Sequence, residues 1–166
     1  MPDEDLFSED LVAAAAALLD DARAKGLRIV TAESCTGGLI AALLTEISGS
    51  SDVLERGYVT YANTAKADCL GVPMSVIESH GAVSREVAYA MAAGALKNAD
   101  AEIAIAVTGI AGPTGGTTEK PVGLVHLAVH RKGRITRHDE CRFGDIGRSA
   151  VRLATVKEAL SQLAAI

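Results

Sequence analysis

A run of five apolar residues, 103–107 (IAIAV), leads directly into a glycine-rich segment, 108–116 (TGIAGPTGG). A short apolar run without polar alternation is typical of a strand in the middle of a sheet, covered on both faces. Two other short runs, 27–32 and 57–62, are also followed by predicted helices: apolar residues recur at helical spacing from Leu39, and Asn63 or Thr64 can cap a short helix that ends at Leu70. Because strands that alternate with helices form a sheet covered by helices, the sequence predicts an α/β fold, namely a three-layer α/β/α sandwich with a mixed β-sheet.

The remaining elements can be assigned from periodicity and punctuation. The predicted helices are 9–25, a segment starting at 39, 63–70, 84–97 and a last one starting near 145–149. The last two strands, 122–130 and 134–142, are expected to pair as an antiparallel hairpin around Lys132-Gly133. No repeat or linker interrupts the 166 residues, so we expect one domain over 1–166, with a poorly ordered tail at 1–8.

Composition excludes several classes of protein. The net charge of −5 opposes a general nucleic-acid binder, which needs a basic face. The cysteines, Cys35, Cys69 and Cys141, lie far apart and suggest neither a disulfide framework nor a zinc site, so reduced thiols in the cytoplasm are expected. The first ten residues are acidic rather than leader-like, and the longest apolar run has nine residues, whereas a membrane span needs about 20.

Three predicted loops, 33–38, 58–66 and 108–116, leave strands at their carboxyl ends, where open α/β sheets bind ligands. The first places the hydroxyl of Ser34 and the thiol of Cys35 before a helix, where backbone N–H groups favour an anion. This arrangement suits a nucleophile with an oxyanion hole or a phosphate site. It equally suits helix capping by small polar side chains, which is common.

The other two loops contribute a candidate base and a candidate anion-binding segment. Lys66 could act as a base, directly or through Tyr61, if desolvation lowers its pKa. The loop 108–116 lacks the GxxxxGK[ST] and GxGxxG patterns, so neither an ATPase nor a dinucleotide site is indicated, although its amides can bind an anion. Cys35 is the alternative nucleophile, but a cysteine nucleophile would need an imidazole partner, and no histidine lies on these loops. His126 and His130 share a strand face without an apparent third metal ligand, so no metal or cofactor is expected.

Five motifs occur in one order along the chain: TAESCTGG at 31–38, GYVTYAN at 57–63 followed by Ala65-Lys66, GAVS at 81–84, VTGIAGP at 107–113 with Gly115-Gly116, and PVGLV at 121–125. Together they resemble the CinA C-terminal domain family, and the similarity runs from about residue 9 to the C-terminus. For members that stand alone, the resemblance implies hydrolysis of nicotinamide mononucleotide to nicotinic acid mononucleotide and ammonia. It also favours a homo-oligomer.

The resemblance assigns roles to individual residues. The family's catalytic serine, tyrosine and lysine map onto Ser34, Tyr61 and Lys66, and its ligand-binding loop matches Thr108 and Gly109. Amide hydrolysis also requires donors for the oxyanion and a site for the nucleotide phosphate. Candidate residues for these two tasks are Cys35, Thr36, Gly37, Gly38, Gly109 and Gly112, together with Arg142 or Arg148, the latter lying slightly later than the family's basic residue.

Other functions would use the same loops, and the sequence alone does not distinguish them from hydrolysis of nicotinamide mononucleotide. The domain could bind a pyridine nucleotide without reacting with it and regulate a partner, in line with the family's link to competence and DNA damage. It could hydrolyse a different amide, since this chemistry recurs on unrelated folds. Direct DNA binding is disfavoured by the acidic charge and the 3% aromatic content.

Overall fold

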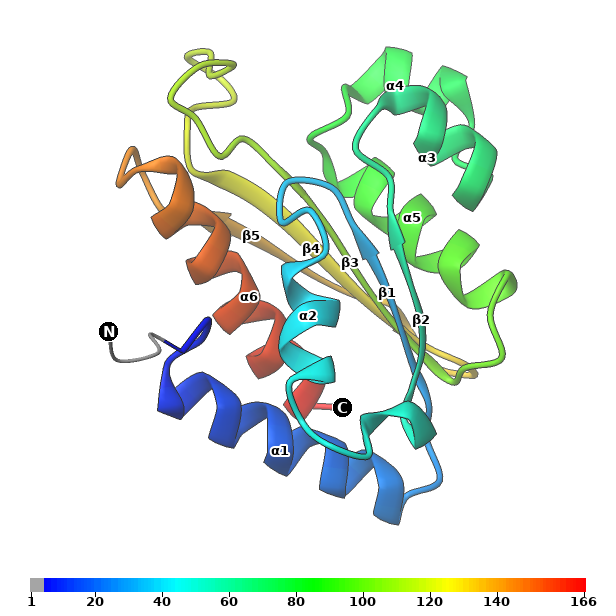
Figure 1. Ribbon diagram of the computed structural model, residues 1–166. Coiled ribbons are helices and arrows are strands. Elements are labelled where there is room, and N and C mark those ends of the chain that lie inside the picture. Colours follow the sequence, from blue (N-terminus) through cyan, green and yellow to red (C-terminus); the bar gives the residue numbers. More distant parts are fainter. Residues whose placement is uncertain (1–4) are drawn as a thin grey trace.

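The computed structural model describes residues 5–166 and contains a five-stranded sheet with helices on both faces (Figure 1). The strands are β1 (Ile29–Glu33), β2 (Leu54–Val59), β3 (Ile103–Gly109), β4 (Leu124–Arg131) and β5 (Arg137–Arg142). Their order is β2-β1-β3-β4-β5, and β1 runs parallel to both β2 and β3. β4 is antiparallel to β3 and to β5, so the predicted mixed sheet and hairpin are confirmed.

The helices form the two outer layers (Figure 1). One face of the sheet is covered by α1 (Glu9–Ala24), α2 (Leu39–Thr45) and α6 (Arg148–Ala164). The opposite face is covered by α3 (Asn63–Leu70), α4 (Met74–His80) and α5 (Arg85–Lys97). A short 3-10 turn, Ser50–Asp52, lies between α2 and β2. The three-layer α/β/α sandwich is therefore confirmed. None of the helices in residues 5–166 is both long enough and apolar enough to cross a membrane.

The two faces of the central strands differ in side-chain size. Ile103 and Ile105 of β3 belong to the core beneath α1, α2 and α6. Ala104 and Ala106 belong to the core beneath α5, where they pack with Met91. Because successive residues of a strand point to opposite faces, the run IAIAV places isoleucine on one face and alanine on the other. The small alanines allow α5 to lie close to the sheet.

The start of β2, the segment between α3 and α5 and the predicted tail differ from the expectations. β2 begins at Leu54 rather than at 57, because this edge strand is partly exposed and accepts charged residues that obscure its start. α4 was not predicted, because Pro73 reads as a stop; it is instead the N-cap of α4, where proline's missing N–H costs nothing. In the expected tail, Phe7 is buried in the core and Ser8 caps α1, so these two residues belong to the fold, whereas 1–4 lie outside the described residues.

Gly94 fixes how closely α5 packs against the end of α3. A Cβ built at this position would lie 1.8 Å from the carbonyl oxygen of Leu70, which is backbone and cannot turn aside. We expect Gly94→Ala to lower the free energy of unfolding by about 3 kcal/mol or more, because the two helices must move apart. Urea unfolding followed by circular dichroism measures this loss.

The matched control for this prediction is Ala93→Ser. Ala93 is the preceding residue of α5 and is exposed, so adding one heavy atom there is expected to change the stability by less than about 0.5 kcal/mol. If Gly94→Ala unfolded at the same urea concentration as the Ala93→Ser variant, the close contact between α3 and α5 would not exist in solution.

Candidate active site

The turn after β1 is built around the carboxylate of Glu33, which is fully buried. Its Oε1 accepts hydrogen bonds from the hydroxyl of Thr36 at 2.7 Å and from the N–H of Ile40 at 2.9 Å, and its Oε2 accepts from the N–H of Ala41 at 3.1 Å. A carboxylate is well suited to the free N–H groups that begin a helix. Glu33 therefore caps α2, which leaves the hydroxyl of Ser34 available for another partner.

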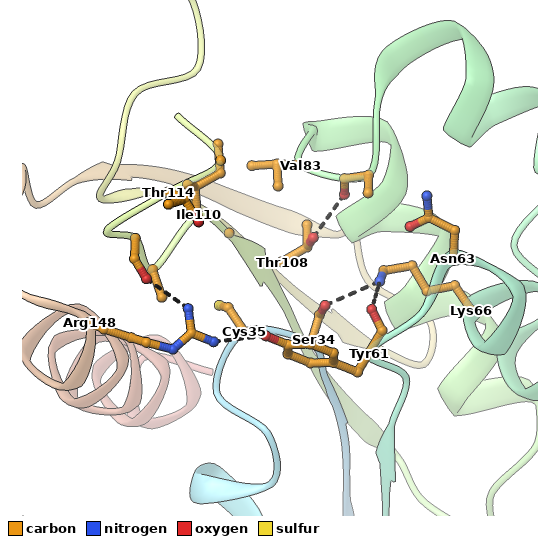
Figure 2. Close-up of a pocket in the computed structure, with 15 residues that line it drawn as sticks. Ser34, Cys35, Tyr61, Asn63, Lys66, Val83, Thr108, Ile110, Thr114 and Arg148 are labelled. Carbon is orange, nitrogen blue, oxygen red and sulfur yellow. Dashed lines mark hydrogen bonds between the residues drawn. The ribbon is translucent and has the colours of Figure 1, made fainter. Parts of the chain in front are cut away.

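The partner of Ser34 is Lys66, which α3 brings to the same point (Figure 2). The Lys66 Nζ lies 3.1 Å from the Ser34 Oγ, 3.0 Å from the carbonyl oxygen of Thr60 and 3.4 Å from that of Tyr61. All three partners are uncharged, and the Lys66 residue is only 1% exposed. Burial disfavours the charged ammonium and lowers the pKa of Lys66 below its ordinary value. The structure thus supplies the desolvation that a lysine base requires.

Cys35 has the opposite electrostatic setting. Burial, reinforced by the negative charge of Glu33, raises the pKa of the Cys35 thiol to about 11. A thiol nucleophile needs a lowered pKa and a base within reach. Cys35 lines the pocket, but its thiol stays protonated near neutral pH and is a poor nucleophile there.

Ser34 and Lys66 open onto a pocket of about 260 Å³ at the carboxyl ends of β1 and β3. Five of the predicted binding residues line it, namely Cys35, Thr108, Gly109, Gly112 and Arg148. The hydroxyl of Thr108 donates to the carbonyl of Ala82 at 2.8 Å and so connects β3 to the segment before α5. The three predicted loops therefore converge on one cavity.

Arg148, in the first turn of α6, spans one side of this pocket (Figure 2). Its guanidinium donates to the carbonyl of Gly112 at 2.8 Å and to the hydroxyl of Tyr61 at 2.8 Å. Tyr61 is 61% exposed, and its contact with Lys66 is through the backbone carbonyl. Of the two expected routes for the Ser34 proton, the direct one has its contact in place, because Lys66 reaches Ser34 directly while Arg148 holds the Tyr61 hydroxyl.

Four other predicted binding residues lie outside the pocket lining. Thr36, Gly37 and Gly38 shape the turn: Thr36 is bound to Glu33, and the two glycines have φ values of +60° and +100°, which favour glycine. Arg142 lies on β5, where its Nε donates to Glu140 at 2.7 Å. Alternation along the edge strand carries Arg142 away from the pocket.

The sequence analysis missed three pocket residues and one long-range contact. The missed lining residues are Asn63, Ala82 and Val83, which all fall within the five sequence motifs. The lining residues Ile110, Ala111, Thr114 and Gly115 belong to the loop 108–116, whose amides were expected to bind an anion. Arg152 of α6 donates to the carbonyls of Cys35 and Thr36, each at 3.1 Å, and no local pattern indicates this contact.

The histidines lie apart from the proposed chemistry. His126 contacts His138 of β5 at 2.8 Å between ring nitrogens, and His130 contacts the hydroxyl of Thr136. The two histidines that share a face of β4 thus have separate partners. In residues 5–166, no group of three or more His, Cys, Asp or Glu side chains is arranged to hold a metal ion.

Comparison with known proteins places this geometry in a family. The family model of the CinA C-terminal domain matches residues 11–166. Nicotinamide-nucleotide amidohydrolase PncC of Escherichia coli strain K12 is 50% identical over 143 residues, which cover 85% of each chain. A CinA-like protein of Syntrophus aciditrophicus is 50% identical over 157 residues, 93% of this chain.

The crystal structure of competence/damage inducible protein CihA from Agrobacterium tumefaciens superposes with a TM-score of 0.95 at 54% identity, covering 98% of both chains. The chain spans between 26% and 36% of the length of several curated relatives, which are named CinA-like or putative competence-damage inducible proteins. The matched region, the fold and the identity agree. The chain belongs to the CinA C-terminal domain family.

Proposed function

We propose that this protein hydrolyses the carboxamide of nicotinamide mononucleotide to nicotinic acid mononucleotide and ammonia, with Ser34 as nucleophile. The observation that carries the proposal is the 3.1 Å contact between the Ser34 Oγ and the Nζ of a buried lysine, Lys66, at the wall of a pocket. A purely regulatory binding site has no need of a serine paired with a desolvated amine. The substrate class is supported by the E. coli relative named nicotinamide-nucleotide amidohydrolase.

The first half-reaction transfers the acyl group to serine. As the Ser34 Oγ attacks the carboxamide carbon, neutral Lys66 takes the hydroxyl proton and becomes an ammonium. The carbonyl oxygen becomes an oxyanion, which backbone N–H groups of the turn after Ser34 stabilise. When the tetrahedral intermediate collapses, the C–N bond breaks, and the Lys66 ammonium returns its proton to the departing nitrogen, which leaves as ammonia.

The second half-reaction uses the same groups in the opposite order. Lys66, again neutral, takes a proton from a water molecule that attacks the ester carbon. The C–O bond to Ser34 breaks, the Ser34 oxygen regains a proton from Lys66, and the product leaves as a carboxylic acid that ionises. Apart from the substrate and one water molecule, no group outside the chain enters these proton transfers, so the scheme uses no cofactor.

The nucleotide phosphate needs a separate site. Arg148 provides a positive charge at the pocket wall, and the glycine-rich loop adds Gly112, Thr114 and Gly115. Loop amides together with a guanidinium suit an anion. We therefore propose that the carboxamide faces Ser34 while the phosphate lies toward Arg148 and the loop after β3.

Ammonia release from a panel of amides tests this function directly. We expect turnover of nicotinamide mononucleotide that exceeds that of nicotinamide riboside, free nicotinamide and glutamine, because only the mononucleotide offers both the ring carboxamide and the phosphate. Saturable binding of nicotinamide mononucleotide without ammonia release would instead support the regulatory alternative. Faster turnover of another amide would replace the substrate but keep the reaction.

The position of Tyr61 leads to a prediction about its hydroxyl. Because Lys66 reaches Ser34 without it, Tyr61→Phe removes one hydrogen bond to Arg148 and leaves the nucleophile and base in place. We expect kcat/KM to fall by about tenfold at most, the value of one ordinary hydrogen bond. Steady-state kinetics with nicotinamide mononucleotide measure it. A loss as large as that of the nucleophile variant would show that the hydroxyl transfers the proton after all.

A further inference from the structure

We propose that Arg152 is a positioning residue that orients the turn after Ser34 so that the free N–H of Cys35 stabilises the oxyanion. This inference rests on the proposed amide hydrolysis. Arg152 lies on α6, and its Nε and one terminal nitrogen donate to the carbonyls of Cys35 and Thr36, each at 3.1 Å. Both acceptors are backbone oxygens of the two residues that immediately follow the nucleophile.

Peptide geometry shows what these two hydrogen bonds determine. In a trans peptide the C=O and the following N–H point in opposite directions. With the Thr36 carbonyl held by Arg152, the N–H of Gly37 points the opposite way, where it donates to the Ser34 carbonyl. The N–H of Cys35 lies on the other side of the peptide that carries this Ser34 carbonyl, so it is directed away from Gly37.

Neither the N–H of Cys35 nor that of Thr36 has a hydrogen-bond acceptor within the described part of the chain. Thr36 is fully buried and lies outside the pocket lining, so a substrate atom does not reach its N–H. Cys35 is 5% exposed and lines the pocket. Its free N–H, directly after a serine that faces a lysine base, fits a ligand atom that arrives with the substrate, namely the developing oxyanion.

The choice of arginine suits this task. A planar guanidinium offers two N–H groups in a fixed fork, and here they bind two successive carbonyls, whereas the ammonium of a lysine is a single point donor. The Thr36 carbonyl also accepts from the N–H of Leu39, so the fork closes the turn onto the start of α2. Gly37 and Gly38 allow backbone angles that other residues rarely adopt, so a peptide without the arginine can rotate.

Kinetics of Arg152→Lys and Arg152→Gln test the assignment, with Arg137→Lys as the matched control. Arg137 also donates to one backbone carbonyl, that of Ala165, but at the far end of α6. We expect both Arg152 variants to lose about 10²-fold in kcat with KM changed by only a few fold, the pattern of a lost oxyanion donor. The control is expected to keep the wild-type values. Unchanged kcat in both Arg152 variants would overturn the proposal.

The thioamide analogue of nicotinamide mononucleotide separates oxyanion positioning from general damage. Sulfur accepts hydrogen bonds poorly, so the wild-type protein is expected to prefer the oxygen substrate strongly. That preference should shrink by at least about tenfold in the Arg152 variants, because the donors that distinguish oxygen from sulfur are misplaced. An equal loss on both substrates would show a merely structural role and reject the assignment.

A readout without substrate keeps this test independent of the proposed function. N-ethylmaleimide labelling, followed peptide by peptide in a mass spectrometer, compares buried Cys35 with exposed Cys69 in each protein. We expect Cys35 labelling to rise about tenfold relative to Cys69 in the Arg152 variants and to stay at the wild-type level in Arg137→Lys. Unchanged Cys35 labelling would reject positioning by Arg152 even if no amide were hydrolysed. Increased labelling in a chain whose wild type releases no ammonia would reject only the proposed function.

Discussion

Ser34→Ala is expected to lower kcat for nicotinamide mononucleotide by about 10⁴-fold or more, the loss typical of a removed nucleophile. Alanine keeps the backbone and the Glu33 cap of α2 but deletes the oxygen that lies 3.1 Å from the Lys66 Nζ. Because the oxygen reacts rather than binds, the affinity for nicotinamide mononucleotide should change by only a few fold. Ammonia release and calorimetric binding, measured on the same preparation, check the two halves of this prediction.

The neighbouring residue provides the matched comparison. Burial raises the pKa of the Cys35 thiol to about 11, so about one thiol in 10⁴ is ionised at pH 7. Cys35→Ala is therefore expected to retain activity within about tenfold of the wild type, the difference reflecting packing at the pocket wall. If Cys35→Ala were inactive and Ser34→Ala active, the thiol would be the nucleophile and the assignment would be wrong.

Trapping separates attack by serine from direct attack by water. An ester on Ser34 reacts with hydroxylamine to give a hydroxamic acid, and ammonia is released in either case. We expect hydroxamate to form in the wild type at the expense of the carboxylate product, without a change in the rate of ammonia release if acylation is slow. Ammonia release with no hydroxamate at any hydroxylamine concentration would contradict an acyl-serine.

Much of this site was predictable because its parts are local in sequence. Ser34 and the glycines after it follow a strand directly, and the loop 108–116 follows the apolar run of β3. The carboxyl ends of parallel strands meet at one edge of a sheet, so topology alone brings these loops together. The side-chain pattern of β3, with isoleucine on one face and alanine on the other, is likewise a local property.

The contacts that sequence reasoning missed join distant segments. Arg152 reaches the turn after β1 from the last helix, and the sequence analysis instead selected Arg142 and Arg148 as the basic residues. The start of α6 at Arg148 is preceded by a glycine without a capping side chain, so the sequence gives no sharp boundary there. With that boundary known, the four-residue spacing of Arg148 and Arg152 places both on one face of α6, toward the pocket.

The burial of Lys66 was also beyond the sequence. A lysine on a short helix reads as a solvated surface group, and α3 has no strong apolar stripe that would mark one face as buried. Its burial arises because the chain between β2 and α3 folds over it and presents the carbonyls of Thr60 and Tyr61. This is a property of tertiary packing, and it converts an ordinary lysine into a candidate base.

Lys66→Met is expected to reduce kcat/KM by about 10³-fold or more and to change the pH dependence of what remains. Methionine replaces a buried aliphatic chain with one of similar length but cannot accept the serine proton. Lys66→Arg is the second variant, because arginine keeps a positive charge but does not become neutral at any accessible pH.

The two variants together distinguish a base from a fixed charge. If Lys66 acts as base, both variants are inactive. If Lys66 acts only through its charge, Lys66→Arg retains activity and the base assignment fails. Lys97→Met, at an exposed position in the last turn of α5, controls for the loss of a lysine.

The direction of the Lys66 pKa shift fixes the sign of two pH effects. Burial lowers that pKa below the ordinary value of 10.5. The kcat/KM of the wild type should therefore rise with pH until Lys66 is neutral, and this rise should vanish in Lys66→Met.

The second effect concerns stability. At pH values between the pKa of Lys66 in the folded protein and 10.5, the unfolded chain holds more protons than the folded one. The free energy of unfolding of the wild type should therefore increase with pH relative to that of Lys66→Met. Urea unfolding at a series of pH values up to 10 measures this difference. A difference that did not change with pH would mean that Lys66 is charged and well solvated in the folded protein, and a charged lysine cannot take the proton from Ser34.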